Sequence, residues 1–222
     1  MDSMTIFTAW LGLFSVAFTF MPLGLVFDWK RRGTADGFSS INLVLPVVVT
    51  SCWLKHGFLT NDLTNIRINS VNICFFVFYV LAFGYYQPKR KYLLIQLSTA
   101  LITLLSIQLY VESQDSAIKA DTMGSIAAMS QILSLAGGIY EIKRVISMGH
   151  TEYVPATFQF LLFFLIGQWL LFGILTNNIY IAAANAAGLI VNIITIALYF
   201  VYPPLTWRVP IIGTGPQQKK TD

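Results

Sequence analysis

The sequence predicts an all-α integral membrane protein with seven transmembrane helices, arranged as two parallel three-helix repeats joined by a linker helix (3+1+3). Three observations lead to this prediction. The 222-residue chain is 56% hydrophobic and only 11% charged, with a mean hydropathy of +0.68. It contains seven apolar runs of about 20 residues, the length that crosses a bilayer. Two stretches of the chain also repeat each other at a constant offset of 116 residues.

The composition indicates that lipid is the main solvent of this chain. A soluble domain carries about 25% charged residues, and 11% is too few to cover a surface exposed to water. The net charge is +4, and because the basic residues lie between apolar runs they favour membrane orientation over nucleic-acid binding. Both cysteines, Cys52 and Cys74, fall inside apolar runs, so neither a disulfide framework nor a metal site is expected. No cofactor is expected either, and the first run is read as a retained helix.

The seven apolar runs lie at residues 5–27, 39–60, 66–87, 92–111, 123–145, 155–177 and 179–202. In lipid a spanning backbone must satisfy its own hydrogen bonds, which favours helices. The fourth run has no counterpart in the repeat and is the most polar of the seven, which fits a linker helix. Its polar residues are Gln96, Ser98, Thr99, Thr103, Ser106 and Gln108.

The repeat needs no gap over its length and sets the order of the helices. The matched pairs are Trp53/Trp169, Gly57/Gly173, Leu59/Leu175, Thr60/Thr176, Asn61/Asn177, Asn69/Asn185, Tyr86/Tyr202 and Pro88/Pro204. The offset places the first helix on the fifth, and an even number of crossings gives both units the same orientation. A three-helix unit ends on the wrong side to begin an identical copy, so one linker helix is needed. We expect the first repeat at 1–91, a linker helix and loop at 92–120, the second repeat at 121–204 and a disordered cytoplasmic tail at 205–222.

The charge distribution predicts the orientation in the membrane. The first, third and fifth connections and the tail carry eleven basic residues, and the opposite side carries three. The eleven are Lys30, Arg31, Arg32, Lys89, Arg90, Lys91, Lys143, Arg144, Arg208, Lys219 and Lys220, and the three are Lys55, Arg67 and Lys119. The positive-inside rule then places the C-terminus in the cytoplasm and the N-terminus outside. We expect a multi-pass protein of the plasma membrane, with the Golgi or another endomembrane as the alternative.

Short motifs in a fixed order carry a resemblance to a known family. They are Phe38-Ser39-Ser40, Trp53-Leu54-x-x-Gly57, Asn69, Tyr86-Gln87-Pro88, Thr151-Glu152-Tyr153-Val154-Pro155, Trp169, Gly173, Ala184-Asn185 and Tyr202. On these motifs the chain resembles the SWEET sugar transporters of the MtN3/saliva type, and the animal members more than the plant ones. The resemblance extends to about Pro204. It implies energy-independent, bidirectional uniport of mono- or disaccharides by alternating access, and it allows a homo-oligomer.

The resemblance also implies that Asn69, Asn185, Trp53 and Trp169 line a central cavity and bind the sugar. A carboxamide offers donors and an acceptor without charge, and an indole stacks on apolar sugar faces and donates its N–H. From the residues alone, interhelical hydrogen bonds for the asparagines and an interfacial aromatic belt for the tryptophans stay open. A tryptophan on both sides narrows the cavity, which favours a glucose-like monosaccharide.

Hinge positions follow from the same resemblance. Members of the family carry a proline in each of the first, second, fifth and sixth helices, and the matching positions here are Pro22, Asn42, Gly138 and Pro155. Glycine can weaken a helix, and Pro46, one turn beyond Asn42, can replace the missing kink. We expect these five residues to act as hinges, although Pro155 also fits an ordinary helix start. Since Pro22 maps on Gly138, the two repeats are not expected to hinge identically.

Other functional classes are disfavoured. Apart from residues at their ends, the apolar runs lack the ionisable side chains of a proton or sodium relay, which argues for a facilitator without a coupling ion. No nucleophile–base set, phosphate loop or zinc motif is present in the sequence, so an enzyme is not expected. The alternatives are a related seven-helix carrier for another small solute, such as an amino acid, or a seven-helix receptor. The expected partners are a sugar and membrane lipid, with no nucleic acid.

Overall fold

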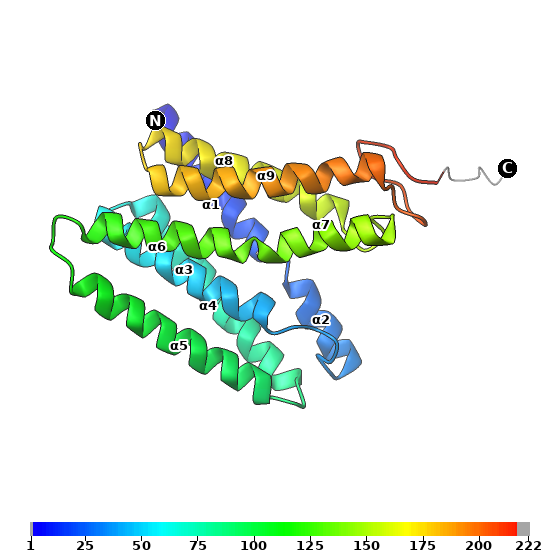
Figure 1. Cartoon of the computed structure of the whole chain (residues 1–222), viewed down its shortest axis with the longest axis horizontal. Helices are drawn as coiled ribbons and strands as arrows, with labels where there is room; N and C mark the ends of the chain where they lie inside the picture. Colours follow the sequence, from blue (N-terminus) through cyan, green and yellow to red (C-terminus); the bar gives the residue numbers. More distant parts are fainter. Residues whose placement is uncertain (1, 217–222) are drawn as a thin grey trace. The chain divides into compact units, whose positions relative to one another are not determined.

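The computed structural model describes residues 2–216, which contain helices and no strand (Figure 1). The helices are α1 (Ser3–Thr19), α2 (Leu23–Arg32), α3 (Ile41–Thr60), α4 (Leu63–Tyr86), α5 (Lys91–Glu112), α6 (Lys119–Ser134), α7 (Ala136–Met148), α8 (Ala156–Leu175) and α9 (Ile179–Val201). Within the described residues, seven helical segments are long and apolar enough to cross a membrane. Two of them, Ser3–Arg32 and Lys119–Met148, are each made of two helices. The prediction of seven membrane-spanning segments is confirmed.

The described residues form two compact units, which divide between Gln131 and Ile132. In the first unit, α4 packs against α1, α2 and α3, and α3 also packs against α5 (Figure 1). In the second unit, α9 packs against α7 and α8. The fifth spanning segment therefore begins in the first unit with α6 and ends in the second with α7.

The helix bounds reproduce the 116-residue offset of the sequence. The helix α1 begins at Ser3 and α6 at Lys119, while α4 begins at Leu63 and α9 at Ile179. The helix α5 lies between the two matched sets and has no counterpart among the described residues, as expected of a linker helix. The 3+1+3 order of helices is confirmed.

The tight turns before α4 and α9 are also equivalent. Asn61 and Asn177 adopt the left-handed conformation with φ of 54° and 53°, which asparagine tolerates better than most residues. The next residues, Asp62 and Asn178, cap the helices with their side-chain oxygens, which accept from backbone N–H groups at 3.0 and 3.1 Å. Both repeats therefore enter their third spanning helix through the same backbone geometry.

A glycine in each repeat allows two neighbouring helices to approach closely. A Cβ atom added to Gly57 on α3 would lie 3.1 Å from the Ile66 side chain and 3.3 Å from its backbone nitrogen. At Gly173 on α8, the same atom would lie 2.6 Å from the backbone nitrogen of Ala182. The requirement for glycine is stricter in the second repeat, because a backbone contact cannot yield as a side chain can.

Both two-part spanning segments break at equivalent positions. The helix α1 ends at Thr19 and α2 begins after Pro22, which cannot continue the backbone hydrogen bonding of a helix. The second break falls at Leu135, 116 residues after Thr19, where no proline is present. The first segment reaches Arg32 and the fifth Met148, beyond their predicted ends at 27 and 145.

The predicted hinge residues occupy different environments. Pro22 precedes the first residue of α2, and Gly138 lies inside α7, just after the second break. Pro46 lies inside α3, which continues through it, and Asn42 lies in the first turn of that helix. Pro155 is the residue immediately before α8, as a helix start signal predicts. The hinge role of all five residues stays a prediction.

Each unit has its own apolar core, built at matching positions but with different side chains. In the first unit Trp29 packs edge to face on Phe83, with ring centroids 5.5 Å apart. The matching residues of the second unit are Val145, which is smaller than Trp29, and Tyr199, and both are buried. There the Tyr199 ring contacts Trp207, at 6.2 Å, from the segment after α9.

The segment after α9 is folded, and the prediction of a disordered tail is wrong for residues 205–216. Val209 is buried, and the Thr214 hydroxyl donates to the carbonyl of Tyr199 at 2.8 Å. The carboxylate of Glu152 accepts from the backbone N–H groups of Leu205 and Thr206 at 2.6 and 3.0 Å. The prediction was based on the polar, glycine-rich composition of this segment and did not take into account Trp207 and Val209, which pack against the second unit. The rest of the predicted tail, residues 217–222, lies outside the described residues.

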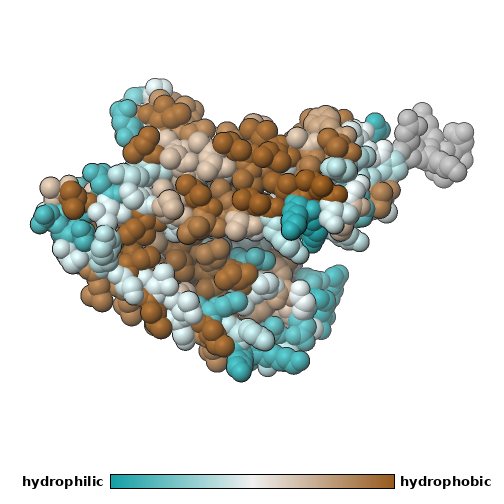
Figure 2. Space-filling view, viewed as in Figure 1, coloured by the Kyte–Doolittle hydropathy of each residue, from teal (hydrophilic) through white to brown (hydrophobic). Residues whose placement is uncertain are grey.

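The outer surface of the helices is apolar, as a lipid-exposed surface requires. Figure 2 shows apolar side chains over much of the visible face, with hydrophilic ones gathered toward helix ends. The linker helix α5 shows this most clearly, since Leu94, Leu101 and Leu109 are all more than half exposed. A soluble protein rarely exposes so many large apolar side chains in one place, so the structure agrees with the composition.

Candidate functional site

The two predicted site residues of the first repeat lie on helices that pack against each other, Trp53 on α3 and Asn69 on α4. Trp53 is 7% exposed, and its indole Nε1 donates to the side-chain oxygen of Gln131, on α6, at 2.6 Å. Its ring also meets His56 edge to face at 5.8 Å. Trp53 is therefore held in one orientation by a polar partner at one end and a ring contact along its side.

The Asn69 side chain is buried, at 8% exposure, and it is bonded within its own helix. Its Nδ2 donates to the backbone carbonyl of Asn65 at 3.0 Å and also to the side-chain oxygen of Asn65. These bonds run back along one face of α4, because residues four apart lie one above the other on a helix. No interhelical hydrogen bond of Asn69 occurs among the described residues, which disfavours a role as glue between helices.

The second repeat presents the same pair of residue types on its own packed helices, α8 and α9. Asn185 is 7% exposed, and its Nδ2 donates to the backbone carbonyl of Ile181 at 2.8 Å. Trp169 is half-buried and meets Phe172 edge to face, with centroids 5.6 Å apart. Each unit thus holds a buried asparagine whose amide nitrogen binds the carbonyl one turn earlier.

The sequence-based prediction missed two residues that contact these side chains. Asn65 fixes the carboxamide of Asn69, and its position four residues earlier on an expected helix was the available signal. Gln131 fixes the indole of Trp53, and a glutamine inside an apolar run was the available signal. The matched residues at the 116 offset are Ile181 for Asn65 and Ser15 for Gln131, so neither belongs to the repeat.

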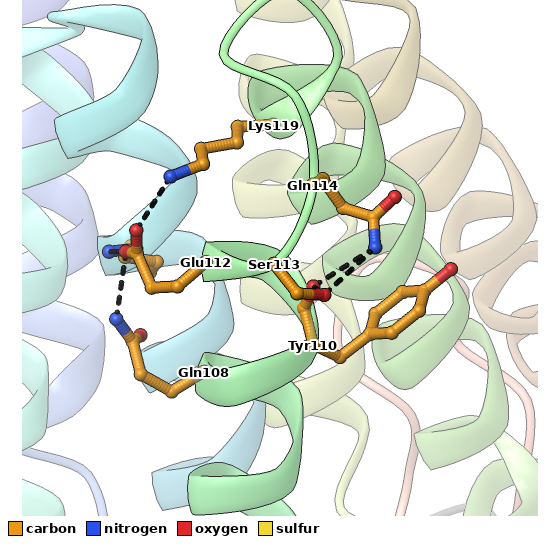
Figure 3. Close-up of polar contacts among 7 residues, drawn as sticks. Gln108, Tyr110, Glu112, Ser113, Gln114 and Lys119 are labelled. Carbon is orange, nitrogen blue, oxygen red and sulfur yellow. Dashed lines mark hydrogen bonds and ion pairs between the residues drawn. The ribbon is translucent and has the colours of Figure 1, made fainter.

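A charged cluster ties the end of the linker helix to its neighbours in the first unit. Glu112, the last residue of α5, pairs with Lys55 of α3 at 2.6 Å. It also pairs with Lys119 of α6 at 2.8 Å (Figure 3). Gln108 donates to the same carboxylate at 3.1 Å, one turn earlier on α5. This cluster uses two of the three basic residues predicted to lie on the outer side. It links helices and contains none of the predicted site residues.

The second unit also holds a cavity of about 370 Å³ beside the start of α8. Its lining residues are Glu152, Tyr153, Pro155, Ala156, Thr157, Trp207, Arg208 and Pro210. One predicted hinge residue, Pro155, lines it, and none of the four predicted binding residues does. The cavity forms where the segment after α9 folds onto the loop before α8.

Comparisons with known proteins agree on one family. The sequence profile of the family described as "Sugar efflux transporter for intercellular exchange" matches residues 6–91 and again 121–206. The chain is 24% identical to "Sugar transporter SWEET1" of Caenorhabditis elegans and 27% identical to "Bidirectional sugar transporter SWEET11" of Arabidopsis thaliana, over 85% and 78% of its length. It spans 62% of the length of each of these two relatives.

A solved structure shows the same fold. The structure of a eukaryotic SWEET transporter matches with a TM-score of 0.79 at 19% identity, and the match covers 89% of this chain and 97% of that one. At this identity the match supports the helix arrangement rather than the function. The two profile matches, each over one three-helix set, carry the assignment of the family.

Proposed function

Because this chain belongs to the family of sugar efflux transporters for intercellular exchange, whose members are carriers rather than enzymes, we propose that it is a bidirectional sugar uniporter. It moves monosaccharides, and glucose-like ones in preference to disaccharides, by alternating access in a membrane. The proposal includes Asn69, Asn185, Trp53 and Trp169 as the residues that contact the sugar.

The observation that carries this proposal is a buried asparagine at the matching position of each unit. Asn69 and Asn185 are 8% and 7% exposed, and each binds the carbonyl four residues earlier, at 3.0 and 2.8 Å. A buried carboxamide in an apolar helix has a cost unless its polar atoms are used. Neutral donors and acceptors suit sugar hydroxyls, each of which can both donate and accept.

The distribution of charge supports uniport without a coupling ion. The helices α8 and α9, which carry Trp169 and Asn185, contain no Asp, Glu, Lys or Arg. Proton-coupled carriers use ionisable side chains within their spans to bind and release the proton. We therefore expect flux to follow the sugar gradient alone.

The excess of basic residues near Arg32, Lys91 and Arg144 supports an N-terminus outside and a C-terminus in the cytoplasm. We propose that the protein lies in the plasma membrane. We keep the division into repeats at 1–91 and 121–204 around a linker at 92–120. The breaks at Pro22 and Leu135 are the positions at which we expect the first and fifth spanning segments to bend.

Counterflow in proteoliposomes tests the proposed function. Vesicles containing purified protein are loaded with unlabelled glucose, and the entry of labelled glucose is followed with and without an imposed pH gradient. We expect transient accumulation of label that is unchanged by the pH gradient and absent from protein-free vesicles. A rate that follows the proton gradient would contradict uniport. The absence of counterflow with every monosaccharide and disaccharide tested would contradict sugar transport itself.

A further inference from the structure

Asn65 is a buried polar residue beside the proposed sugar contact Asn69, and it is only 1% exposed. Its side-chain oxygen accepts from Asn69, whereas its own side-chain nitrogen, Nδ2, is buried without a hydrogen-bond partner. A buried donor without a partner destabilises a fold. An asparagine at this position is therefore poorly explained by stability alone.

The orientation of the two carboxamides follows from the chemistry of the backbone. The carbonyl oxygen of Asn65 can only accept, so the Asn69 side-chain atom 3.0 Å from it must be the nitrogen Nδ2. The same nitrogen donates its second hydrogen to the side-chain oxygen of Asn65. Both N–H groups of Asn69 are thereby used, while its Oδ1 accepts no hydrogen bond within residues 2–216.

The second repeat lacks the hydrogen bond between two asparagine side chains that Asn65 and Asn69 form in the first. Asn185 donates to the carbonyl of Ile181 at 2.8 Å, as Asn69 does to that of Asn65. However, Ile181 has no side-chain acceptor, so it leaves the second N–H of Asn185 without the bond that Asn65 provides in the first repeat. Two asparagines that match in the repeat therefore differ in hydrogen-bonding capacity.

We propose that Asn65 is a positioning residue that restricts Asn69 to accepting hydrogen bonds from the sugar, whereas Asn185 can both donate and accept. This inference rests on the proposed function, because it assigns the chemistry of one contact within it. A sugar hydroxyl that faces Asn69 must then act as a donor. A fluorine in place of that hydroxyl can only accept, so it meets the oxygen of Asn69 unfavourably.

The repeat itself supplies the test variant, Asn65→Ile, which copies the residue that stands at the matching position 181. The assay measures inhibition of glucose counterflow by singly deoxygenated and singly fluorinated glucose analogues at each hydroxyl position. For wild-type protein we expect one position at which the fluoro analogue binds no better than the deoxy analogue. In N65I the freed N–H of Asn69 can donate to fluorine, so the fluoro analogue at that position should bind about fivefold better than the deoxy analogue, the contribution of one hydrogen bond.

Two further results distinguish positioning from a structural role. N65I removes the unpartnered donor of Asn65 but also frees one N–H of the buried Asn69. Its abundance in the membrane and its melting temperature should therefore stay close to those of wild-type protein. The reciprocal variant Ile181→Asn should give the second N–H of Asn185 a side-chain acceptor. Binding of the fluoro analogue at a different hydroxyl position should then weaken. An unchanged fluoro-to-deoxy ratio in N65I, or loss of folded N65I from the membrane, would overturn the inference while glucose counterflow by wild-type protein continued. If wild-type protein carried no sugar, the proposed function would fail first and this inference with it.

Discussion

The hydroxyl of Tyr79 on α4 donates a 2.7 Å hydrogen bond to the backbone carbonyl of Thr19, the last residue of α1. The side chain of Thr19 in turn donates to Asn72 at 2.8 Å. The break between α1 and α2 leaves carbonyls without helical partners, and lipid offers them none. Tyr79 therefore stabilises the broken form of the first spanning segment from a neighbouring helix.

Removal of this hydroxyl should destabilise the first unit. In Tyr79→Phe the ring stays packed, but the Thr19 carbonyl loses its donor, and we expect a loss of about 1 kcal/mol in stability. The measurement is the thermal unfolding of purified protein in detergent. Tyr85→Phe is the matched control, because Tyr85 lies on the same helix and is 75% exposed. Equal melting temperatures for Y79F, Y85F and wild type would show that the bond contributes nothing.

The two close-packing glycines should differ in their tolerance of alanine. In Gly173→Ala the new Cβ would lie 2.6 Å from a backbone nitrogen of α9, so α8 and α9 must move apart. We expect a cost of about 1–3 kcal/mol, typical of overpacking. Gly57→Ala meets its nearest atom, in a side chain, at 3.1 Å and should cost less. Melting temperatures of the two variants decide the order, and a G57A protein less stable than G173A would contradict it.

The segment after α9 should depend on the charge of Glu152. The hydroxyl of Thr206 and the neighbouring backbone N–H groups favour the ionised carboxylate and lower the pKa of Glu152 below its ordinary value of 4.5. A carboxylate with a lowered pKa stabilises the fold when ionised. That stabilisation is fully present above pH 4.5 and is lost as the pH falls through the lower pKa of the folded state.

The variant Glu152→Gln tests this expectation at neutral pH. Hydrogen exchange at the backbone amides of Leu205 and Thr206 should be faster in E152Q than in wild-type protein. The difference in melting temperature between the two proteins should shrink as the pH is lowered below 4.5. Glu141→Gln serves as the control, because Glu141 forms a partly exposed pair with Arg144, and such pairs contribute little. A difference that persists unchanged in acid would show that the charge of Glu152 is not responsible.

The duplicated helices could be predicted because the repeat fixes both composition and spacing. The helices α4 and α9 begin 116 residues apart, at Leu63 and Ile179, as the pairing of Asn69 with Asn185 implies. The break at Leu135 could not be predicted in this way, since the proline of the first repeat has no copy there. The positive-φ asparagines Asn61 and Asn177, by contrast, are a matched pair of the sequence repeat.

The contacts that fix the site residues were harder to predict, because they lie outside the repeat. Asn65 and Gln131 have Ile181 and Ser15 at the matching positions, so the comparison of the two halves gave no reason to single them out. The folded segment after α9 was missed because a short polar stretch was judged on composition. Its order depends on tertiary contacts of Trp207 and Val209 with the second unit, and composition does not report those.

Uptake of labelled glucose by the variants Asn69→Ala and Asn185→Ala tests the central claim most directly. The proteins are expressed in cells that lack endogenous sugar carriers, and flux is divided by the amount of carrier at the membrane. Wild-type protein and Ser98→Ala, an exposed change on the linker helix, should transport equally well. Each asparagine variant should reach the membrane and lose most of its flux. Unchanged flux in both asparagine variants would contradict the proposed sugar contacts, and no flux in wild-type protein would contradict sugar transport.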